Sequence, residues 1–433
     1  MRAINSTNFE QSNVEFIEFW LLDTFSDLEI IYKLPKNEWD AIALNYTSGT
    51  TGNPKGVVYH HRGAYLNAIG NTLVWEMPMF PKYLWTLPMF HCNGWCFPWT
   101  ITERAGTHVC LRQPAGELIV NALIKHKVSH LSGAPIIMQM IADHLISNKI
   151  DLTQEIKMMT AGAPPPEAVL GKMKSCGIDV IHVYGLTETY GPSVVCAWKT
   201  EWNNLSPDEQ AKMKARQGVP YSVQEDIKIV DPKTLKNVPQ DGETIGEVFT
   251  RGNITMRGYL KNEKATKESF EDGWFHTGDI GKIDDDGFLK ITDRKKSLIV
   301  TSGGKNIAPA PLENALITSV YIEQVVAIGD KRNFISALIT PNFEALEGYL
   351  KSKGHDGLSP SEMVSHPDTL ELYNSEVEER MVDFAQYEKI KKFTICDRLF
   401  ELEKNELTPS LKIRRKAVNE NFKDIIDLMY DSE

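Results

Sequence analysis

Short apolar runs alternate with amphipathic stretches between residues 46 and 190. The runs are rich in β-branched and aromatic residues, and several end in Gly or Pro followed by small or polar residues. Strands that alternate with helices predict a largely parallel sheet with right-handed crossovers, and ligands bind at the carboxyl ends of such strands. The predicted strands lie in YLWTLPMF, THVCL, VSHLSGAP, IKMMTAGAP and IDVIHVYG.

The pattern becomes β-rich with frequent turns over residues 222–259, which predicts a small antiparallel or barrel-like part. A hairpin-like IDDDGFLKITDR follows, and RKKSLIVTSGGKN then predicts a hinge and a second hairpin. Strands mix with helices from there to the C-terminus. The predicted fold class is α/β, with an N-terminal remnant over residues 1–45, a large domain over 46–292 and a smaller α+β domain over 293–433.

Charge and composition narrow the function classes. The 433 residues carry a formal net charge of −11, which disfavours broad contact with nucleic acid or anionic lipid, because both attract cationic surfaces. The N-terminal MRAINSTNFEQSN lacks the apolar centre of a signal peptide, and no run reaches the ~18 to 20 apolar residues of a membrane span. We expect a cytoplasmic protein with no nucleic-acid partner and no integral membrane association.

Six sparse, irregularly spaced cysteines are unlike a disulfide framework, so reduced thiols are expected. Two of them lie in PMFHCNGWCFPW, which together with the following His-x-Cys could be imagined as a zinc cluster of His91, Cys92, Cys96, His108 and Cys110. The spacing matches no familiar zinc signature, and the aromatic neighbours favour buried thiols in the wall of a pocket.

The stretch YTSGTTGNPKG, Tyr46 to Gly56, concentrates glycines, hydroxyl side chains and one lysine in eleven positions. Glycines let backbone N–H groups converge on an anion, Ser and Thr donate further hydrogen bonds, and Lys55 adds a positive charge, so the pattern is typical of phosphate binding. The common P-loop is excluded by spacing, because Lys55 follows Pro54 and precedes Gly56. From composition alone, a flexible surface loop remains the alternative.

The order [ST]-[ST]-G-[ST]-[ST]-G-x-P-K-G resembles the phosphate loop of the adenylate-forming superfamily, which includes acyl-CoA synthetases. Further segments follow in that family's order: YGLTET, GWFHTGD, DRKKSLIVTSGGKNI and LTPSLKIRRK. The resemblance covers roughly residues 35–430. It implies the adenylate-forming enzyme fold: a large N-terminal domain, made of a parallel α/β sheet and a small β-barrel-like part, and a mobile C-terminal α+β domain.

The resemblance also assigns the ATP site. Tyr184 and the adjacent Gly185 would lie at the adenine, and Asp279 would accept hydrogen bonds from both ribose hydroxyls with help from Arg294. Thr187 would contact phosphate, and Glu188 would bind Mg²⁺ with Thr50 as a second metal ligand. The segment between adenine and the acyl site is Gly162, Ala163 and Pro164. The β- and γ-phosphates would be held by Thr47, Ser48, Gly49, Thr50, Thr51, Gly52 and Lys55.

The two half-reactions of the family imply further roles. Lys412 takes the place of the adenylation lysine, although Leu411 precedes it where Gly is usual. Lys296 occupies the hinge about which the C-terminal domain swings. Gly303 and Gly304 resemble the hairpin that lines the pantetheine tunnel for coenzyme A.

The acyl site is implied by three residues. His91 matches a residue beside the acyl carboxylate, Trp95 resembles the gate of a fatty-acid tunnel, and Val183 adds apolar wall. Up to about Asp279 the chain resembles the short- and medium-chain branch, including methylmercaptopropionate-CoA ligases, whereas from about Asp293 it resembles the long-chain fatty-acid branch. This mixture indicates a recombinant of two relatives.

The function implied is that of an AMP-forming fatty acyl-CoA synthetase. It would use ATP and Mg²⁺ to form an acyl-adenylate from a medium- or long-chain fatty, or related alkyl, carboxylic acid and pass the acyl group to coenzyme A; a homodimer is left open. Two alternatives remain: a truncated, catalytically inactive nucleotide-binding fragment, because only 45 residues precede Tyr46, or adenylation without transfer to coenzyme A.

Overall fold

The computed structural model describes residues 2–3, 34–47, 54–162, 165–232, 234–295, 297–408 and 413–431. These residues form two compact units, each of which is described by itself. The first holds Pro54–Thr277 and Gly281–Ile291 together with the described residues up to Thr47, and the second holds Gly278–Ile280 and Thr292–Glu433.

The first unit is built on a sheet whose described strands follow the order β1-β5-β4-β6-β7-β8-β9-β10. Strands β1 and β4 to β8 pair in parallel, whereas β9 and β10 are antiparallel. Each predicted apolar run overlaps one of the strands β4 to β8, so the predicted parallel sheet is confirmed. The bounds are Arg2–Ala3 (β1), Lys82–Trp85 (β4), Thr107–Cys110 (β5), His130–Gly133 (β6), Ile156–Thr160 (β7), Ile178–Leu186 (β8), Gly191–Val195 (β9) and Val219–Pro220 (β10).

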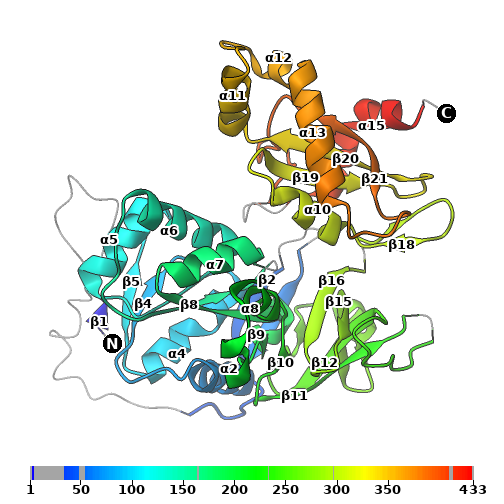
Figure 1. The fold of residues 1–433 in the computed structure, drawn as a ribbon. Coiled ribbons are helices and arrows are strands. Elements are labelled where there is room, and N and C mark those ends of the chain that lie inside the picture. Colours follow the sequence, from blue (N-terminus) through cyan, green and yellow to red (C-terminus); the bar gives the residue numbers. More distant parts are fainter. Residues whose placement is uncertain are drawn as a thin grey trace. The chain divides into compact units, whose positions relative to one another are not determined.

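Helices cover both faces of this sheet (Figure 1). Side chains alternate between the faces along each strand, so Leu84 packs in a cluster with α5, α6 and α7, whereas Tyr83 and Trp85 pack with residues at the end of α2 and in α4. The helices are His61–Val74 (α2), Cys92–Trp95 (α3), Phe97–Glu103 (α4), Gly116–His126 (α5), Pro135–Ser147 (α6), Glu167–Ser175 (α7) and Pro207–Lys214 (α8), with 3₁₀ turns at Thr187–Thr189 (η1) and Thr200–Asn204 (η2).

Two smaller sheets follow from the β-rich part of the sequence. One has the order β11-β12-β15-β14, with β16 paired to β15, and its antiparallel pairing confirms the predicted antiparallel part. The other places β3 between β2 and β13. The bounds are Ala41–Tyr46 (β2), Gly56–His60 (β3), Gln224–Val230 (β11), Gly246–Gly252 (β12), Gly258–Tyr259 (β13), Glu263–Glu268 (α9), Phe270–Glu271 (β14), Trp274–Ile283 (β15) and Leu289–Arg294 (β16).

The second unit packs helices on both faces of the sheet β19-β20-β21 (Figure 1). Val325 and Ala327 pack with α10 and α13, whereas Val326 and Ile328 pack with α14 and α15. The predicted second hairpin is present as β17 and β18. The bounds are Ile299–Val300 (β17), Asn306–Ile307 (β18), Pro309–Ile317 (α10), Ile322–Ile328 (β19), Ile335–Pro341 (β20), Phe343–Ser352 (α11), Pro360–Ser365 (α12), Pro367–Arg380 (α13), Ile390–Ile395 (β21), Arg415–Asn421 (α14) and Lys423–Tyr430 (α15).

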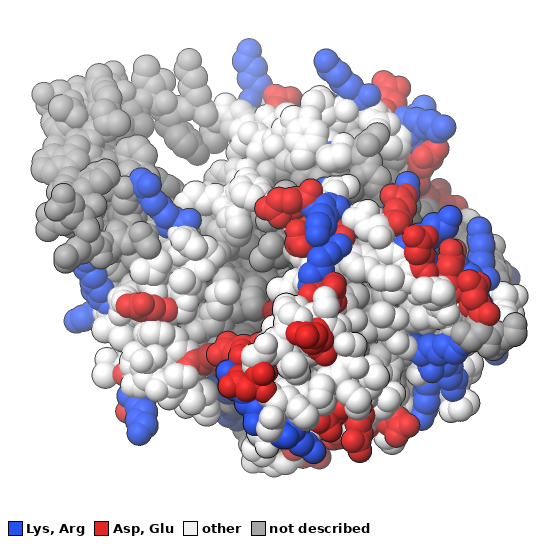
Figure 2. All heavy atoms as spheres, turned by 90° about the horizontal axis from the view of Figure 1, so that it is seen from above, with Lys and Arg blue, Asp and Glu red and all other residues white. Residues whose placement is uncertain are grey.

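The described surface mixes charges of both signs. On the face drawn in Figure 2, Lys and Arg side chains lie among Asp and Glu side chains. Across the described residues, the helices are too short or too polar to cross a lipid bilayer.

Gly185, near the end of β8, allows the close approach of β9, and the sequence analysis also places this glycine in the site. A Cβ atom on Gly185 would lie 1.7 Å from the carbonyl oxygen of Gly191 on the paired strand. We expect Gly185→Ala to lower the free energy of unfolding by about 3 kcal/mol or more, because the clash is with backbone that must shift. Thermal or urea unfolding of the purified variant measures this loss.

Gly171→Ala is the matched control. Gly171 lies in α7, where an added Cβ atom meets nothing within 4 Å. Alanine favours helix by about 1 kcal/mol over glycine, so this variant should be as stable as the parent or slightly more stable. Equal stability of the two variants would contradict the close approach of the backbone at Gly185.

Candidate functional site

The described ends of the glycine-rich segment are joined to each other. The backbone N–H of Lys55 donates to Thr47 Oγ1 at 3.0 Å, and the backbone N–H of Thr47 donates to the carbonyl oxygen of Lys55, also at 3.0 Å. The base of the segment is therefore closed. The intervening predicted phosphate ligands, Ser48, Gly49, Thr50, Thr51 and Gly52, lie outside the described residues.

The predicted metal ligand Glu188 is held by Tyr259. The hydroxyl of Tyr259 donates to Glu188 Oε1 at 2.7 Å, while Lys55 Nζ lies 4.0 Å from the centre of the Tyr259 ring. Burial, followed by the negative charge of Glu188, raises the pKa of Tyr259, so the phenol stays protonated and keeps donating. One tyrosine thus connects the predicted cation of the phosphate loop to the predicted carboxylate of the metal site.

Thr187 and Glu188 form part of a 3₁₀ turn, η1, that neighbouring elements hold in place. The hydroxyl of Tyr59 in β3 donates to the carbonyl oxygen of Thr187 at 2.8 Å. The backbone N–H of Met256 donates to the carbonyl oxygen of Glu188 at 2.7 Å. Cys92 Sγ lies 3.5 Å from Thr187 Oγ1 in a hydrogen-bonding contact. The turn is therefore fixed on three sides, while Thr187 and Glu188 stay partly exposed.

The predicted acyl site contains a strained backbone. Each residue from Cys92 to Cys96 has a positive φ, between 46° and 64°. Left-handed backbone costs roughly 1–2 kcal/mol per L-residue, and such strain is concentrated at binding sites. The half-buried His91 immediately precedes this run, and Trp95 is 4% exposed within it.

Contacts from the main sheet and α2 hold the strained run. Asn71 donates through Nδ2 to the carbonyl oxygen of Trp95 at 2.9 Å, and a Cβ atom on Gly191 would lie 2.8 Å from Trp95 Cα. Val183, the third predicted acyl residue, is 1% exposed and belongs to the same apolar cluster as Trp95. The structure therefore brings Trp95 and Val183 into one apolar wall.

The predicted adenine residues lie at neighbouring strand ends. Thr160 of β7 pairs with His182 of β8. Gly162, which has a φ of 91°, comes two residues after Thr160, and the half-buried Tyr184 comes two residues after His182. This is the carboxyl edge at which α/β sheets bind ligands. Ala163 and Pro164 lie outside the described residues.

The predicted ribose residues form an ion pair in the second unit. Asp279 is 3% exposed, and Arg294 Nε lies 3.2 Å from its Oδ1 atom. The neighbouring Asp293 accepts from the backbone N–H groups of Arg294 and Ala310, and burial raises the pKa of its carboxyl. Lys296, the predicted hinge, lies outside the described residues.

The remaining predicted residues are Gly303, Gly304 and Lys412, all in the part of the sequence that forms the second unit. Gly303 and Gly304 are exposed at the tip of the β17–β18 hairpin, where the backbone N–H of Gly304 donates to the carbonyl oxygen of Thr301 and its φ is 75°. Lys412 lies outside the described residues, but Leu407 and Ile413 on either side of it pair as an antiparallel bridge.

The histidine and cysteines considered for zinc make other contacts. His108 Nδ1 accepts from the indole N–H of Trp85 at 2.9 Å, and Cys96 Sγ donates to the carbonyl oxygen of Tyr190 at 3.4 Å. Burial raises the pKa of the Cys96 and Cys110 thiols, which disfavours the thiolate that zinc requires.

A cavity of about 660 Å³ lies elsewhere in the first unit, at the start of β8 rather than at its carboxyl end. Among its lining residues, Lys157 lies 3.9 Å from Glu76, and Lys214 lies 3.0 Å from Asp179. With these cations paired, and with Tyr184, Thr187 and Glu188 absent from its lining, the cavity does not belong to the candidate site.

Sequence reasoning missed Tyr59 and Tyr259. Each sits in a short strand with nothing unusual in its local pattern, and the register of β13 on β3 places Tyr259 opposite Val57. Only the pairing of segments far apart in the chain reveals that both hydroxyls point to the Thr187–Glu188 turn.

Comparisons with known proteins agree with this fold. The model of the AMP-binding enzyme family matches residues 9–260, and that of the AMP-binding enzyme C-terminal domain matches residues 296–433. The first match begins before residue 35, where the local motifs begin to carry the resemblance.

Curated relatives are plant CoA ligases. They include an acetate/butyrate–CoA ligase, AAE7, peroxisomal, of Arabidopsis thaliana (50% identical, 69% of this chain and 53% of the relative) and an acetate–CoA ligase, CCL3, of Humulus lupulus (48%, 71% and 54%). A trans-cinnamate:CoA ligase, peroxisomal, of Petunia hybrida is 45% identical over 68% of this chain and 52% of its own. The chain spans about half the length of the curated relatives it matches.

The expected cytoplasmic localisation is wrong, because several of these relatives are named peroxisomal. The expectation rested on composition and on an N-terminal stretch without the apolar centre of a signal peptide. Neither separates cytosol from peroxisome, because peroxisomal import reads a short address signal rather than a property of the fold.

Solved structures share the architecture. An o-succinylbenzoate coenzyme A synthetase of Bacillus subtilis, in complex with ATP and magnesium ion, is 26% identical with a TM-score of 0.69, covering 88% of this chain and 70% of its own. ATP-bound MatB of Rhodopseudomonas palustris, 21% identical with a TM-score of 0.70 over 91% and 70%, shares the fold. The chain has the adenylate-forming enzyme fold and belongs to the AMP-binding enzyme family.

Proposed function

We propose that the protein is an AMP-forming acid–CoA ligase. In the first step a carboxylate oxygen attacks the α-phosphorus of ATP, and the bond to pyrophosphate breaks. In the second step the sulfur of coenzyme A attacks the acyl carbon, its proton is released and AMP leaves. The observation that carries the proposal is the contact chain Lys55–Tyr259–Glu188, which joins a loop of phosphate-binding composition to a carboxylate suited to a metal.

The residues at the Thr187–Glu188 turn fit Mg²⁺. Glu188 Oε1 accepts from Tyr259, whereas Oε2 has no hydrogen-bond partner among the described residues. A half-buried carboxylate oxygen of this kind suits Mg²⁺, which binds one or two carboxylates and keeps several waters. Mg²⁺ bound there would neutralise charge on the phosphates. Glu188 would hold the ion while Tyr259 orients the carboxylate.

The remaining contacts support roles in binding the nucleotide. Asp279 has two acceptor oxygens, as recognition of two ribose hydroxyls requires, and Arg294 beside it supplies a cation. Lys412 would approach the α-phosphate and the substrate carboxylate, where an ammonium stabilises the charge that builds up in the transition state.

The observations point to two different acyl chain lengths. Resemblance of the second unit to the long-chain branch favours a medium- or long-chain acid. The apolar wall behind Trp95 belongs to the first unit, however, where the buried aromatics Trp75, Tyr83, Trp85 and Phe97 fill the space of one cluster. Two of the plant relatives are named for acetate or for acetate and butyrate, which supports the same choice, so we propose a short-chain acid.

A substrate panel tests the activity and its chain length together. Purified protein is incubated with Mg-ATP, coenzyme A and each acid from acetate to palmitate, and acyl-CoA is detected by mass spectrometry. We expect thioesters with acids of roughly two to four carbons, because larger chains would have to displace buried aromatic rings. Acyl-adenylate without thioester would contradict transfer to coenzyme A, and absence of both would contradict the proposed ligase activity.

Lys412→Ala separates the half-reactions. We expect carboxylate-dependent exchange of pyrophosphate into ATP to fall by about 100-fold or more, since one preorganised charge at a transition state contributes that much. Thioester formation from supplied acyl-adenylate should change little. Lys416→Ala is the control, because Lys416 is exposed and pairs with Glu420; equal loss of both half-reactions in Lys412→Ala would contradict the assignment.

Tyr259→Phe tests the metal site. Removing the hydroxyl frees Glu188 Oε1 to rotate, so we expect the Mg²⁺ concentration that gives half-maximal pyrophosphate exchange to rise on the order of 10-fold. Tyr65→Phe is the matched control, because Tyr65 is 65% exposed on α2. An unchanged Mg²⁺ dependence in Tyr259→Phe would remove Tyr259 from the metal site.

A further inference from the structure

The described residues on either side of Lys412 lie side by side in the second unit. Leu407 pairs with Ile413 as an antiparallel bridge, and the backbone N–H of Arg414 donates to the carbonyl oxygen of Glu406 at 2.7 Å. We call Glu406, Leu407, Ile413 and Arg414 the stem. Whatever fixes the stem therefore fixes Ile413, the residue that is covalently bonded to Lys412.

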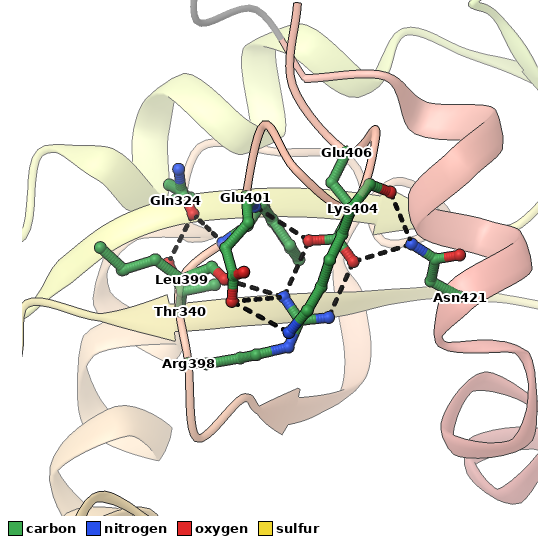
Figure 3. Close-up of polar contacts among 9 residues, drawn as sticks. Gln324, Thr340, Arg398, Leu399, Glu401, Lys404, Glu406 and Asn421 are labelled. Carbon is green, nitrogen blue, oxygen red and sulfur yellow. Dashed lines mark hydrogen bonds and ion pairs between the residues drawn. The ribbon is translucent and has the colours of Figure 1, made fainter.

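The side chain of Glu406 is fully buried beside the stem and surrounded by donors (Figure 3). Arg398 donates to both carboxylate oxygens, at 2.8 and 2.7 Å, Asn421 donates through Nδ2 at 2.9 Å, and the backbone N–H of Glu401 donates at 2.9 Å. The carboxylate thus receives four hydrogen bonds.

Burial alone would raise the pKa of Glu406, but the hydrogen bonds from Arg398, Asn421 and Glu401 together with the charge of Arg398 lower it to about 2. The group is therefore ionised throughout the pH range in which the proposed reaction can be assayed. Its hydrogen bonds with Arg398, Asn421 and Glu401 therefore do not change with pH within that range.

The residues around Glu406 are themselves held by contacts with other parts of the second unit. The guanidinium of Arg398 lies 4.8 Å from the centre of the Phe422 ring, and Asn421, at the end of α14, also donates to the carbonyl oxygen of Lys404 at 3.1 Å. The backbone N–H of Phe400 donates to Gln324 in β19 at 2.7 Å. Glu406 therefore ties the stem to α14 through Asn421 and to residues 398–401, which are bonded to β19 through Phe400 (Figure 3).

A second ion pair holds the chain just after the stem. Arg415 donates to both carboxylate oxygens of Glu313, at 2.7 and 2.9 Å, and to the carbonyl oxygen of Ala327 at 2.9 Å. Both sides of the stem are thus anchored by bidentate charge pairs, whose planar geometry sets orientation as well as distance.

Stability alone is a weak reason for such an arrangement. Desolvation offsets much of the attraction in a buried ion pair, and apolar side chains of similar volume often serve stability equally well. A bidentate pair differs from an apolar contact in allowing one geometry, which matters where a catalytic group must be placed within a fraction of an ångström.

We propose that Glu406 is a positioning residue for adenylation, which fixes the stem through Arg398 and Asn421 so that Lys412 is presented in a single orientation. This rests on the proposed function, in which Lys412 serves the first half-reaction. Glu406 touches neither the substrate nor the reacting atoms in this role.

Glu406→Gln tests the proposal, because it keeps the shape of the side chain and removes its charge. We expect carboxylate-dependent pyrophosphate exchange to fall by 10-fold or more, with thioester formation from supplied acyl-adenylate within about 2-fold of the parent. Glu420→Gln is the matched control, an exposed carboxylate on α14 outside the cluster, and should leave both rates unchanged. Equal loss in both half-reactions, or no loss, would overturn the proposal.

Asn421→Ala covers the case in which Glu406→Gln does not fold. Asn421 is exposed and supplies one of the four hydrogen bonds, so the variant should fold and show a smaller loss, about 3-fold, confined to pyrophosphate exchange. An unchanged exchange rate would count against the proposal.

Hydrogen–deuterium exchange separates failure of this proposal from failure of the proposed function. If the parent protein lacks adenylation activity, the proposed function is wrong, but the amides of residues 407–413 still report on the stem. We expect them to exchange at least 10-fold faster in Glu406→Gln than in the parent, with α13 unchanged. Equal exchange in residues 407–413 would show that Glu406 does not fix the stem.

Discussion

The antiparallel pairing of β13 with β3 is the constraint on which the candidate site depends. It places Tyr259 opposite Val57, close to Lys55 in the preceding segment and within hydrogen-bonding distance of Glu188, 71 positions earlier in the chain. Contacts between residues so far apart require that the loop between them be closed, at a cost in entropy. The site therefore forms only when the sheets of the first unit have folded.

Tyr259 connects two opposite charges through different parts of its ring system. The hydroxyl donates to the carboxylate of Glu188, while the ring face attracts the ammonium of Lys55. Donation of the O–H group makes the ring more electron-rich, which strengthens its attraction for a cation, so the two contacts reinforce each other. In a chain with a net charge of −11, such local placement of a cation would favour binding of the proposed anionic ligand, ATP.

Sequence pattern predicted the elements better than the contacts between them. Strand β7 was visible because its apolar run is bounded by polar and small residues, and the Thr187–Glu188 turn was visible through its motif. The positive φ values from Cys92 to Cys96 were not predictable, because sequence rules assign that backbone mainly to glycine, and Gly94 is the one glycine in the run. Tyr259 was missed because its role arises from pairing over a long distance. The predicted localisation was wrong because amino-acid composition does not contain an organelle-targeting signal.

Glu406 and Glu188 are both held by hydrogen bonds, but they differ in the number of donors that they face, and this difference separates a structural role from the proposed metal-binding one. Glu406 receives four hydrogen bonds and is fully buried, so neither oxygen keeps a lone pair for solvent or for a metal ion. Glu188 receives one, from Tyr259, and is only partly buried. A carboxylate that must bind Mg²⁺ needs orientation without saturation. Oriented through one oxygen, Glu188 would keep the other for the proposed ion, whereas Glu406 uses both to hold the chain.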